Sequence, residues 1–417
     1  MNNLWHGFAD MAAVERDGEF VITRGEGAYV FDDAGRRYLD ATAGLWFCNV
    51  GYGRVEIAAA VERQLREMPA YSLFGDFANS PAIELAELVS QHAPIPGSPV
   101  FFTNGGSDSV DTAIKLARRY WQVLGRPSRR TVITREHAYH GMHVGGTSLA
   151  GIEANLVGYG ELLGGVERVP WDDPKALAKT IDSIGAEHVA AFLCEPVIGA
   201  GGVFFPPEGY LAEVRQICRE REVLFVADEV ITGFGRAGDW FASSRFALEP
   251  DMVLCAKGLT SGYLPMGAVI VAPTVAEPFW DGRAGIWRHG YTYSGHAGAA
   301  AAGVANLRLL EAEGLPQRAR ELETVLADSL SSLTTSPLVS EVRTGAGLLA
   351  AVQLDRAALT AEPALPGRMV AELRRQGVLS RALASGGLQV SPSLVIDAAF
   401  VDELTSGIAT ALEAVQA

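Results

Sequence analysis

The stretch 224–257, LFVADEVITGFGRAGDWFASSRFALEPDMVLCAK, holds two short apolar runs that each end at a charged residue. Asp228 follows the first run, and Lys257 follows the second. The segment between the runs has room for one helix, so the stretch predicts a strand-helix-strand unit with parallel strands. Ligands of such sheets collect at the carboxyl ends of the strands, and we expect Asp228 and Lys257 to lie close together there.

The same pattern extends on both sides of this stretch, from about residue 99 to residue 271. Short apolar runs alternate with helical patterns, which is typical of an α/β fold with helices on both faces of a largely parallel sheet. The predicted strands are Val100–Thr103, Thr131–Thr134, Val189–Cys194, Leu224–Ala227, Met252–Cys255 and Ala268–Val271. The residues that follow these strands are therefore the first candidates for a functional site.

The two ends of the chain have a different pattern. Residues 27–40 predict a short hairpin, and an alanine-rich helix is expected from about Gly298 to Glu313. We predict a large domain over residues 49–298 and a smaller domain built from the N-terminal segment 1–48 and the C-terminal region 299–417.

Composition excludes several classes of function. The chain has 417 residues and a formal net charge of −15, which argues against nucleic acid and anionic membranes as partners. No run approaches the roughly 18 apolar residues of a membrane-spanning helix, and Met1–Asp10 lacks the basic start and apolar stretch of an export signal. We therefore expect a cytoplasmic protein.

The cysteines and histidines give no metal signature. Neither Cys-x-x-Cys nor His-Glu-x-x-His occurs, and the cysteines are widely spaced, so no disulfide framework and no metal site is expected. The cysteines are Cys48, Cys194, Cys218 and Cys255. His140 and His143 are interpreted as loop histidines rather than metal ligands.

Lysine is scarce, because only four of the 34 basic residues are lysines. Lys115, Lys175 and Lys179 fall at solvent-facing positions of predicted helices. Lys257 instead ends a buried strand, where a desolvated amine has a lowered pKa and can attack a carbonyl to form a Schiff base.

Two further features complement this amine. Strand 100–103 runs into Asn104-Gly105-Gly106-Ser107 at a helix start, which is either a phosphate site or a glycine-rich turn capped by Ser107. Asp228 is either a partner for a protonated aromatic nitrogen or an ordinary acid at a strand end. A phosphate site, a ring-nitrogen partner and an amine together match pyridoxal 5′-phosphate. Tyr139 can supply an aromatic surface for its ring, or pack locally as a loop residue.

These residues lie in stretches that resemble the class III pyridoxal-phosphate-dependent aminotransferases, the omega-aminotransferase group of fold type I. The matching stretches are 38–40, 44–46, 102–120, 139–141, 195–202, 228–235, 256–267 and 289–296. The resemblance implies a mostly parallel seven-stranded sheet sandwiched by helices, and a smaller α+β domain from both chain ends. It also implies a homodimer with shared active sites, which can pair further into a tetramer.

The resemblance implies a role for each residue of the cofactor site. Lys257 forms the internal aldimine with the cofactor, and Asp228 pairs with its ring nitrogen. Tyr139 and Val230 hold the two faces of the cofactor ring, and Glu195 lies near the ring hydroxyl. Gly106 and Ser107 bind the phosphate, and Tyr291 and Thr292 of the neighbouring subunit complete the phosphate site.

The resemblance further implies the substrate class, an amine or omega-amino acid donor with a 2-oxo acid acceptor. Trp46, Phe74 and Arg381 are the substrate-binding candidates, with Arg381 holding a carboxylate. Ala200 replaces an acid that pairs with the arginine in glutamate-using relatives, which favours pyruvate. Four alternatives stay open: a 2-oxoglutarate-dependent aminotransferase, an aminomutase, a decarboxylating transaminase and a non-catalytic binding protein.

Overall fold

The structure is a computed structural model that describes residues 3–416. Its main element is a seven-stranded sheet with the order β4-β10-β9-β8-β7-β5-β6. The strands are β4 (Val100–Thr103), β5 (Thr131–Arg135), β6 (Val166–Val169), β7 (Val189–Cys194), β8 (Leu224–Asp228), β9 (Met252–Cys255) and β10 (Gly267–Val271). β10 pairs antiparallel with both of its neighbours, β4 and β9, and every other pairing in this sheet is parallel. The predicted α/β class and the mostly parallel sheet are confirmed.

Both faces of this sheet are buried, which explains why its central strands are continuous apolar runs. In β8, Leu224 and Val226 pack with α5 (Gly106–Val123) and α10 (Pro273–Trp280). Phe225 and Ala227 point to the other face, where α7 (Pro174–Ile184) and α8 (Tyr210–Glu220) cover the sheet. The period-two alternation of a strand thus supplies two cores from one run of residues.

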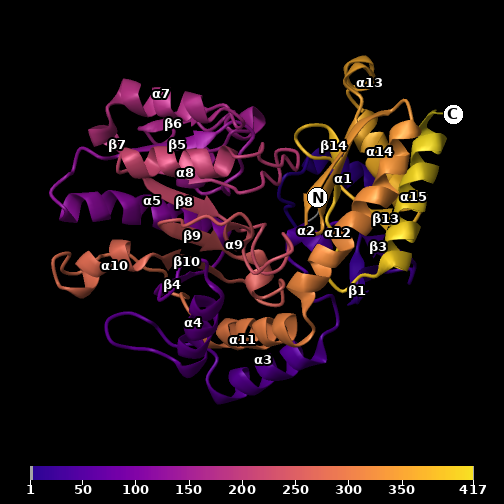
Figure 1. Cartoon of the computed structure of the whole chain (residues 1–417). Coiled ribbons are helices and arrows are strands. Elements are labelled where there is room, and N and C mark those ends of the chain that lie inside the picture. Colours follow the sequence, from indigo (N-terminus) through magenta and orange to yellow (C-terminus); the bar gives the residue numbers. More distant parts are fainter. Residues whose placement is uncertain (1–2, 417) are drawn as a thin grey trace.

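The other helices surround this sheet or form the second part of the molecule. They are α1 (Met11–Asp17), α2 (Ala43–Trp46), α3 (Val55–Glu67), α4 (Ser80–His92), α6 (Val144–Ser148), α9 (Ala242–Arg245), α11 (Ala297–Ala312), α12 (Leu315–Ser331), α13 (Arg356–Ala361), α14 (Leu365–Arg375) and α15 (Ala398–Gln416). The predicted alanine-rich helix is α11, which packs against α3 and α4 beneath the large sheet (Figure 1).

The second part of the molecule combines segments from both ends of the chain (Figure 1). One small sheet joins β1 (Ile22–Glu26), β2 (Tyr29–Asp32) and β3 (Arg37–Asp40) to β13 (Val378–Leu379), which pairs parallel with β3. A second sheet contains β11 (Val339–Ala346), β12 (Leu349–Leu354) and β14 (Gly387–Val390). The hairpin expected at residues 27–40 is formed by β2 and β3.

The side chains of the four cysteines are all buried and none forms a disulfide. Burial raises the pKa of each thiol, to about 11 for Cys194. Within residues 3–416, no helix has the length and apolar character needed to cross a membrane.

Candidate active site

Five strands of the large sheet deliver the predicted site residues to one cavity. Because β4, β5, β7, β8 and β9 run in the same direction, the loops after them share one edge of the sheet. The cavity at this edge is lined by Gly106, Ser107, Val110, Tyr139, His140, Gly141, Glu195, Asp228, Val230, Ile231, Ala256 and Lys257. Seven residues predicted to bind the cofactor are therefore brought together.

Lys257 starts the short 3-10 turn η3 (Lys257–Leu259) directly after β9 and has φ +38°, in the left-handed region. Desolvation lowers the pKa of its amine to about 8, although the nearby Asp228 and Glu195 carboxylates act in the opposite direction. No hydrogen bond to Nζ is found among residues 3–416. The amine therefore faces the cavity available for reaction.

Asp228, at the end of β8, is buried and firmly held. Its Oδ1 accepts a hydrogen bond from the Val230 N–H at 3.1 Å. Its Oδ2 lies 2.6 Å from Nδ1 of His140, a side chain that is itself buried. The tautomer with the proton on Nδ1 satisfies this contact and lets Nε2 accept from the Thr134 hydroxyl at 3.1 Å. His140 thus orients the carboxylate.

The fully buried carboxylate of Glu195 supports the loop that carries Tyr139. Oε1 accepts the Tyr139 N–H at 3.0 Å, and Oε2 accepts the Gly199 N–H at 2.9 Å. Desolvation raises the pKa of Glu195 despite these two bonds. The carboxylate therefore fixes two backbone segments at the rim of the cavity.

The first turn of α5 forms a cradle with the loop after Tyr139. The Ser107 hydroxyl accepts the Met142 N–H at 3.1 Å, and a Cβ on Gly141 would meet Ser107 Oγ at 2.3 Å. A Cβ on Gly106 would meet the Val230 side chain at 2.9 Å. The N–H groups of a first helical turn have no partner within the helix, so this cradle suits an anion.

The cavity fits pyridoxal 5′-phosphate by the chemistry of its lining. An anion cradle, a buried carboxylate and an amine without a hydrogen-bond partner among the described residues match the phosphate, the ring nitrogen and the aldehyde of that cofactor. Tyr139 and Val230 supply an aromatic and an aliphatic surface for the ring faces.

Two predicted substrate residues lie beside Lys257. The centre of the Trp46 ring is 5.9 Å from Lys257 Nζ and 5.0 Å from the guanidinium carbon of Arg381. Trp46 has φ +63°, and its Nε1–H donates to Ser391 Oγ at 3.1 Å. Burial lowers the pKa of Arg381, and no carboxylate pairs with it among the described residues.

The turn that carries Trp46 is organised by Asp40, a residue that the sequence did not single out. Its Oδ1 accepts from the N–H and the hydroxyl of Thr42 at 2.9 and 2.7 Å. Its Oδ2 accepts from the Gly44 N–H at 2.7 Å and the Tyr52 hydroxyl at 2.8 Å. Four hydrogen bonds on one buried carboxylate hold a tight turn in place.

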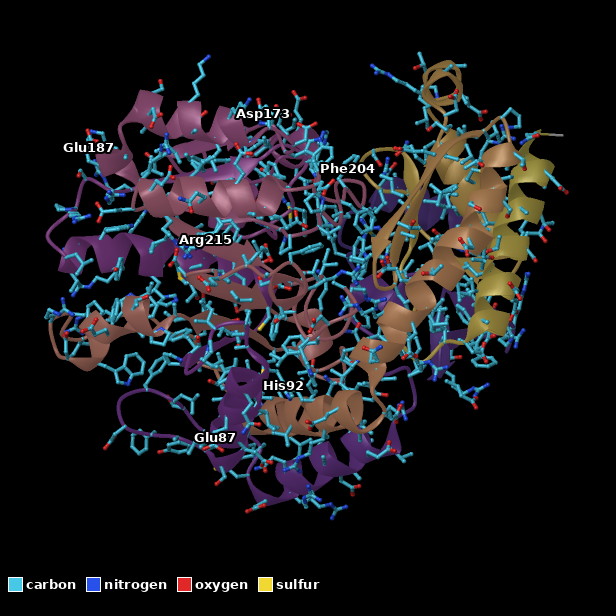
Figure 2. The ribbon with its side chains drawn as sticks, in the orientation of Figure 1. Glu87, His92, Asp173, Glu187, Phe204 and Arg215 are labelled. Carbon is cyan, nitrogen blue, oxygen red and sulfur yellow. The ribbon has the colours of Figure 1, made fainter. Side chains whose placement is uncertain are left out.

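Next to this region, Phe204 lies where the part around the large sheet faces the part containing α12 and α15 (Figure 2). The guanidinium carbon of Arg343 is 4.6 Å from the centre of the Phe204 ring. The same guanidinium donates to Gly202 O at 2.9 Å and to Ser385 Oγ at 3.1 Å. Arg343 therefore ties a loop of the large sheet to the turn that follows Arg381.

Five predicted site residues are not among those that line the cavity: Trp46 and Arg381, which lie beside Lys257, and Phe74, Tyr291 and Thr292, which lie farther away. The Tyr291 hydroxyl donates to Asp108 O at 3.1 Å, so this residue rests on α5 away from the cavity. Thr292 is exposed. Phe74 is 52 % exposed and lines a separate hollow with Trp287.

Both loop histidines have carboxylate partners that their sequence positions did not reveal. His143 Nε2 lies 2.6 Å from Asp108 Oδ1, and His140 contacts Asp228 across 88 residues of sequence. The only signal for His140 is its place directly after Tyr139 on a loop that follows a central strand. No group of three or more His, Cys, Asp or Glu residues suited to a metal ion is found among residues 3–416.

Comparisons with known proteins agree with this geometry. A sequence model described as aminotransferase class-III matches residues 11–412. The chain is 40% identical to the putrescine–pyruvate aminotransferase of Pseudomonas aeruginosa, over 95% of this chain and 91% of that protein. It is 37% identical to the diaminobutyrate–2-oxoglutarate transaminase of Halomonas elongata, over 93% of this chain and 88% of that protein.

A solved structure gives the same answer for the fold. The PLP-bound amine transaminase of an uncultivated Pseudomonas species superposes with a TM-score of 0.94 at 36% identity, covering 99% of each chain. The fold is therefore that of fold type I transferases. The chain belongs to the class III aminotransferases and is a pyridoxal-phosphate-dependent transaminase.

Proposed function

We propose that this aminotransferase takes the amino group of an amine or an omega-amino acid and passes it to pyruvate. The observation that carries this proposal is Arg381, a partly buried guanidinium beside Lys257 and Trp46 with no carboxylate partner among the described residues. A guanidinium in that state is ready to bind a substrate carboxylate with two parallel hydrogen bonds.

The residues around the cavity divide the work of holding the cofactor. Gly106 and Ser107 bind the phosphate at the start of α5, and Asp228 binds the ring nitrogen. Tyr139 and Val230 enclose the ring. When bound, pyridoxal phosphate supplies an aldehyde that takes up the amino group and a protonated ring that delocalises the electrons of a broken C–H bond.

Lys257 acts first as a nucleophile and then as the group that moves a proton. A lowered pKa of about 8 leaves about one tenth of Nζ neutral at pH 7, whereas far less than one per cent of an ordinary lysine is neutral there. The neutral amine of Lys257 would hold the cofactor through its aldehyde, and the free amine would accept the proton that the reaction moves at Nζ and give it back. Asp228 and Glu195 hold a positive charge on Nζ between these two steps.

The acceptor is proposed from Ala200. Ala200 is buried. The resemblance to class III aminotransferases implies that it stands where glutamate-using relatives have an acid that pairs with the arginine, so this partner of Arg381 is missing here. The pyruvate-dependent relative in Pseudomonas aeruginosa supports this choice, and the relative in Halomonas elongata, which uses 2-oxoglutarate, supports the alternative.

A donor and acceptor screen tests the proposal. The purified enzyme is given 1-phenylethylamine, putrescine, taurine or beta-alanine with either pyruvate or 2-oxoglutarate, and the amino acid product is identified by chromatography. We expect alanine to form faster than glutamate with most donors. Glutamate as the sole product would assign the enzyme to the other acceptor class.

Arg381→Leu sharpens this test, because it removes the guanidinium and keeps an apolar wall. Charge-assisted hydrogen bonds contribute about 1.5–3 kcal/mol, so kcat/KM for beta-alanine is expected to fall roughly 10- to 100-fold. The first half-reaction with 1-phenylethylamine, which has no carboxylate, should change little. An equal loss for both donors would refute carboxylate binding by Arg381.

We also propose a homodimer in which Phe74, Tyr291 and Thr292 complete the partner's site. None of these residues lines its own cavity. Thr292 is exposed, Phe74 is exposed at a hollow that also contains Ile286 and Trp287, and Tyr291 is half-buried directly after Gly290, which lines the same hollow. A large exposed apolar area of this kind is typical of a subunit interface. The cytoplasmic location and the division into domains stay predictions.

A further inference from the structure

Asn306 is a buried polar residue in a helix that otherwise presents small and apolar side chains to the core. It lies on α11 and has no exposed surface. One turn away on either side, Ala302 and Leu310 are buried apolar residues. A buried amide is unfavourable unless it is hydrogen-bonded, so its contacts decide what it contributes.

The amide nitrogen of Asn306 binds the turn that carries Lys257. Nδ2 donates to Gly258 O at 2.8 Å and to Leu259 O at 3.0 Å. Because carbonyl oxygens only accept, the nitrogen of the amide and not its oxygen has to face them. Oδ1 accepts no hydrogen bond from the described residues, so these two carbonyls are the polar partners that hold the side chain.

The turn requires support from outside because its backbone is strained. Lys257 has φ +38°, which is unfavourable for a residue with a Cβ. Within the turn, Leu259 N–H donates to Ala256 O at 2.8 Å and Thr260 N–H donates to Lys257 O at 3.3 Å. The carbonyls of Gly258 and Leu259 take no part in these bonds and are the ones that Asn306 binds.

A second buried asparagine approaches the same turn. A Cβ on Gly258 would meet Nδ2 of Asn49 at 2.5 Å, so the residue after Lys257 has to be a glycine. Asn49 is itself fixed, because Nδ2 donates to Phe234 O at 2.8 Å and Oδ1 accepts from Arg236 at 2.8 Å. The turn therefore has little room to relax while Asn306 holds it.

We propose that Asn306 is a positioning residue for Lys257: its two hydrogen bonds to the turn keep the lysine in the left-handed conformation that directs its amine into the cavity. The inference rests on the function proposed above for Lys257. Without these bonds, the turn relaxes and Nζ gains contact with water, which removes part of the desolvation that lowers the pKa of this amine.

The scarcity of lysine makes a direct test possible. The full chain, stripped of cofactor, is labelled with acetic anhydride at a series of pH values, and each labelled lysine is measured by mass spectrometry. Lys115, Lys175 and Lys179 are exposed and serve as internal references. The Lys257 midpoint is the pH at which the rate of labelling of Lys257 reaches half of its maximum. In Asn306→Leu we expect this midpoint to move upward, toward the value of an ordinary lysine, by at least about half a pH unit.

Activity of the holoenzyme gives the second measurement. Small displacements of a catalytic group cost on the order of 10²-fold in rate, so we expect kcat of Asn306→Leu to fall about 10- to 100-fold while KM for the amine donor stays within about twofold. Leu307→Ala is the matched control, because this buried residue is next in the same helix and has no hydrogen bond to the turn. It should lower the unfolding temperature and leave both the Lys257 midpoint and kcat unchanged.

Either of two results would overturn the proposal. One is an unshifted Lys257 midpoint in a folded Asn306→Leu chain, or in Asn306→Ala if the leucine variant does not fold. The other is an equal loss of kcat in Leu307→Ala. The labelling is read without any substrate, so failure of the proposed transamination would leave this test intact.

Discussion

Three local properties favour the reactivity proposed for Lys257: a position at the end of a buried strand, a strained backbone and a desolvated amine. Replacing it tests its role most directly. In Lys257→Ala, the loss of proton transfer alone is expected to reduce kcat roughly 10²- to 10⁴-fold. Borohydride treatment of the wild-type holoenzyme should place the cofactor adduct on the peptide with Lys257 and on no other. Lys175→Ala, an exposed change, should be indistinguishable from wild type.

The pKa of Lys257 predicts how pH governs capture of the cofactor. The amine attacks only when neutral, and it is neutral above its pKa of about 8. The rate at which the cofactor-free enzyme captures pyridoxal phosphate should therefore rise with pH through about 8 and level off above it. A stopped-flow series that follows the visible absorption of the complex measures this. A rate still rising near the ordinary lysine value of 10.5 would show an unperturbed amine.

His140 and His143 form a matched pair for testing buried against exposed contacts. Each ring lies 2.6 Å from a carboxylate, but His140 is buried and His143 is 51% exposed. His140→Leu leaves a buried oxygen of Asp228 without its donor, which costs about 1–3 kcal/mol. We expect a lower unfolding temperature and a lower kcat. His143→Leu should change stability by at most ~0.5 kcal/mol, and comparable losses in both variants would contradict this account.

At the scale of single residues, the sequence predicts those functional residues whose place next to an apolar run is itself unusual. Lys257 and Asp228 are charged residues directly after apolar runs, and no second residue is needed to notice them. His140, Asp40 and Asn306 act through partners that folding brings near, such as Asp228 for His140 and the turn after Lys257 for Asn306. A single polar residue in a loop or a helix carries no signature of such a partner.

At the scale of elements, the loop after β5 and the start of α5 together form the anion cradle that we propose binds the cofactor phosphate. Gly141→Ala tests it, because this glycine has φ +86° and its Cβ would meet Ser107 Oγ at 2.3 Å. Gly125→Ala is the control, since φ is +75° there and nothing lies within 4 Å. The left-handed conformation costs each alanine about 1–2 kcal/mol. Only Gly141→Ala should also weaken cofactor affinity, measured by fluorescence titration, and equal affinities would argue against the cradle.

The six strands predicted from the sequence are confirmed because each is a compact apolar run. The residue pattern does not predict the seventh strand, β6. Its sequence Val166-Glu167-Arg168-Val169 is half charged, and it pairs only with β5 at the edge of the sheet. An edge strand has no need to be apolar on both faces, so short edge strands lack the signal that revealed the others.

At the scale of the whole molecule, the proposed dimer explains why Phe74, Tyr291 and Thr292 lie away from the cavity. We expect the wild-type enzyme to sediment at about twice the 44.3 kDa of one chain. Phe74→Asp places a charge on the proposed interface and should shift the population toward inactive monomer. Val325→Asp on α12, also at an exposed apolar residue, should remain dimeric and active. An active monomer would reject the shared site.

The buried cysteines have a practical consequence for work with this enzyme. Their side chains are enclosed and their thiols resist ionisation, so maleimide reagents have no native target on the folded chain. A cysteine introduced at an exposed position such as Val325 then becomes a unique attachment point for a fluorophore, a spin label or a solid support. Because the thiols are buried, the enzyme can also be handled in air without reducing agents.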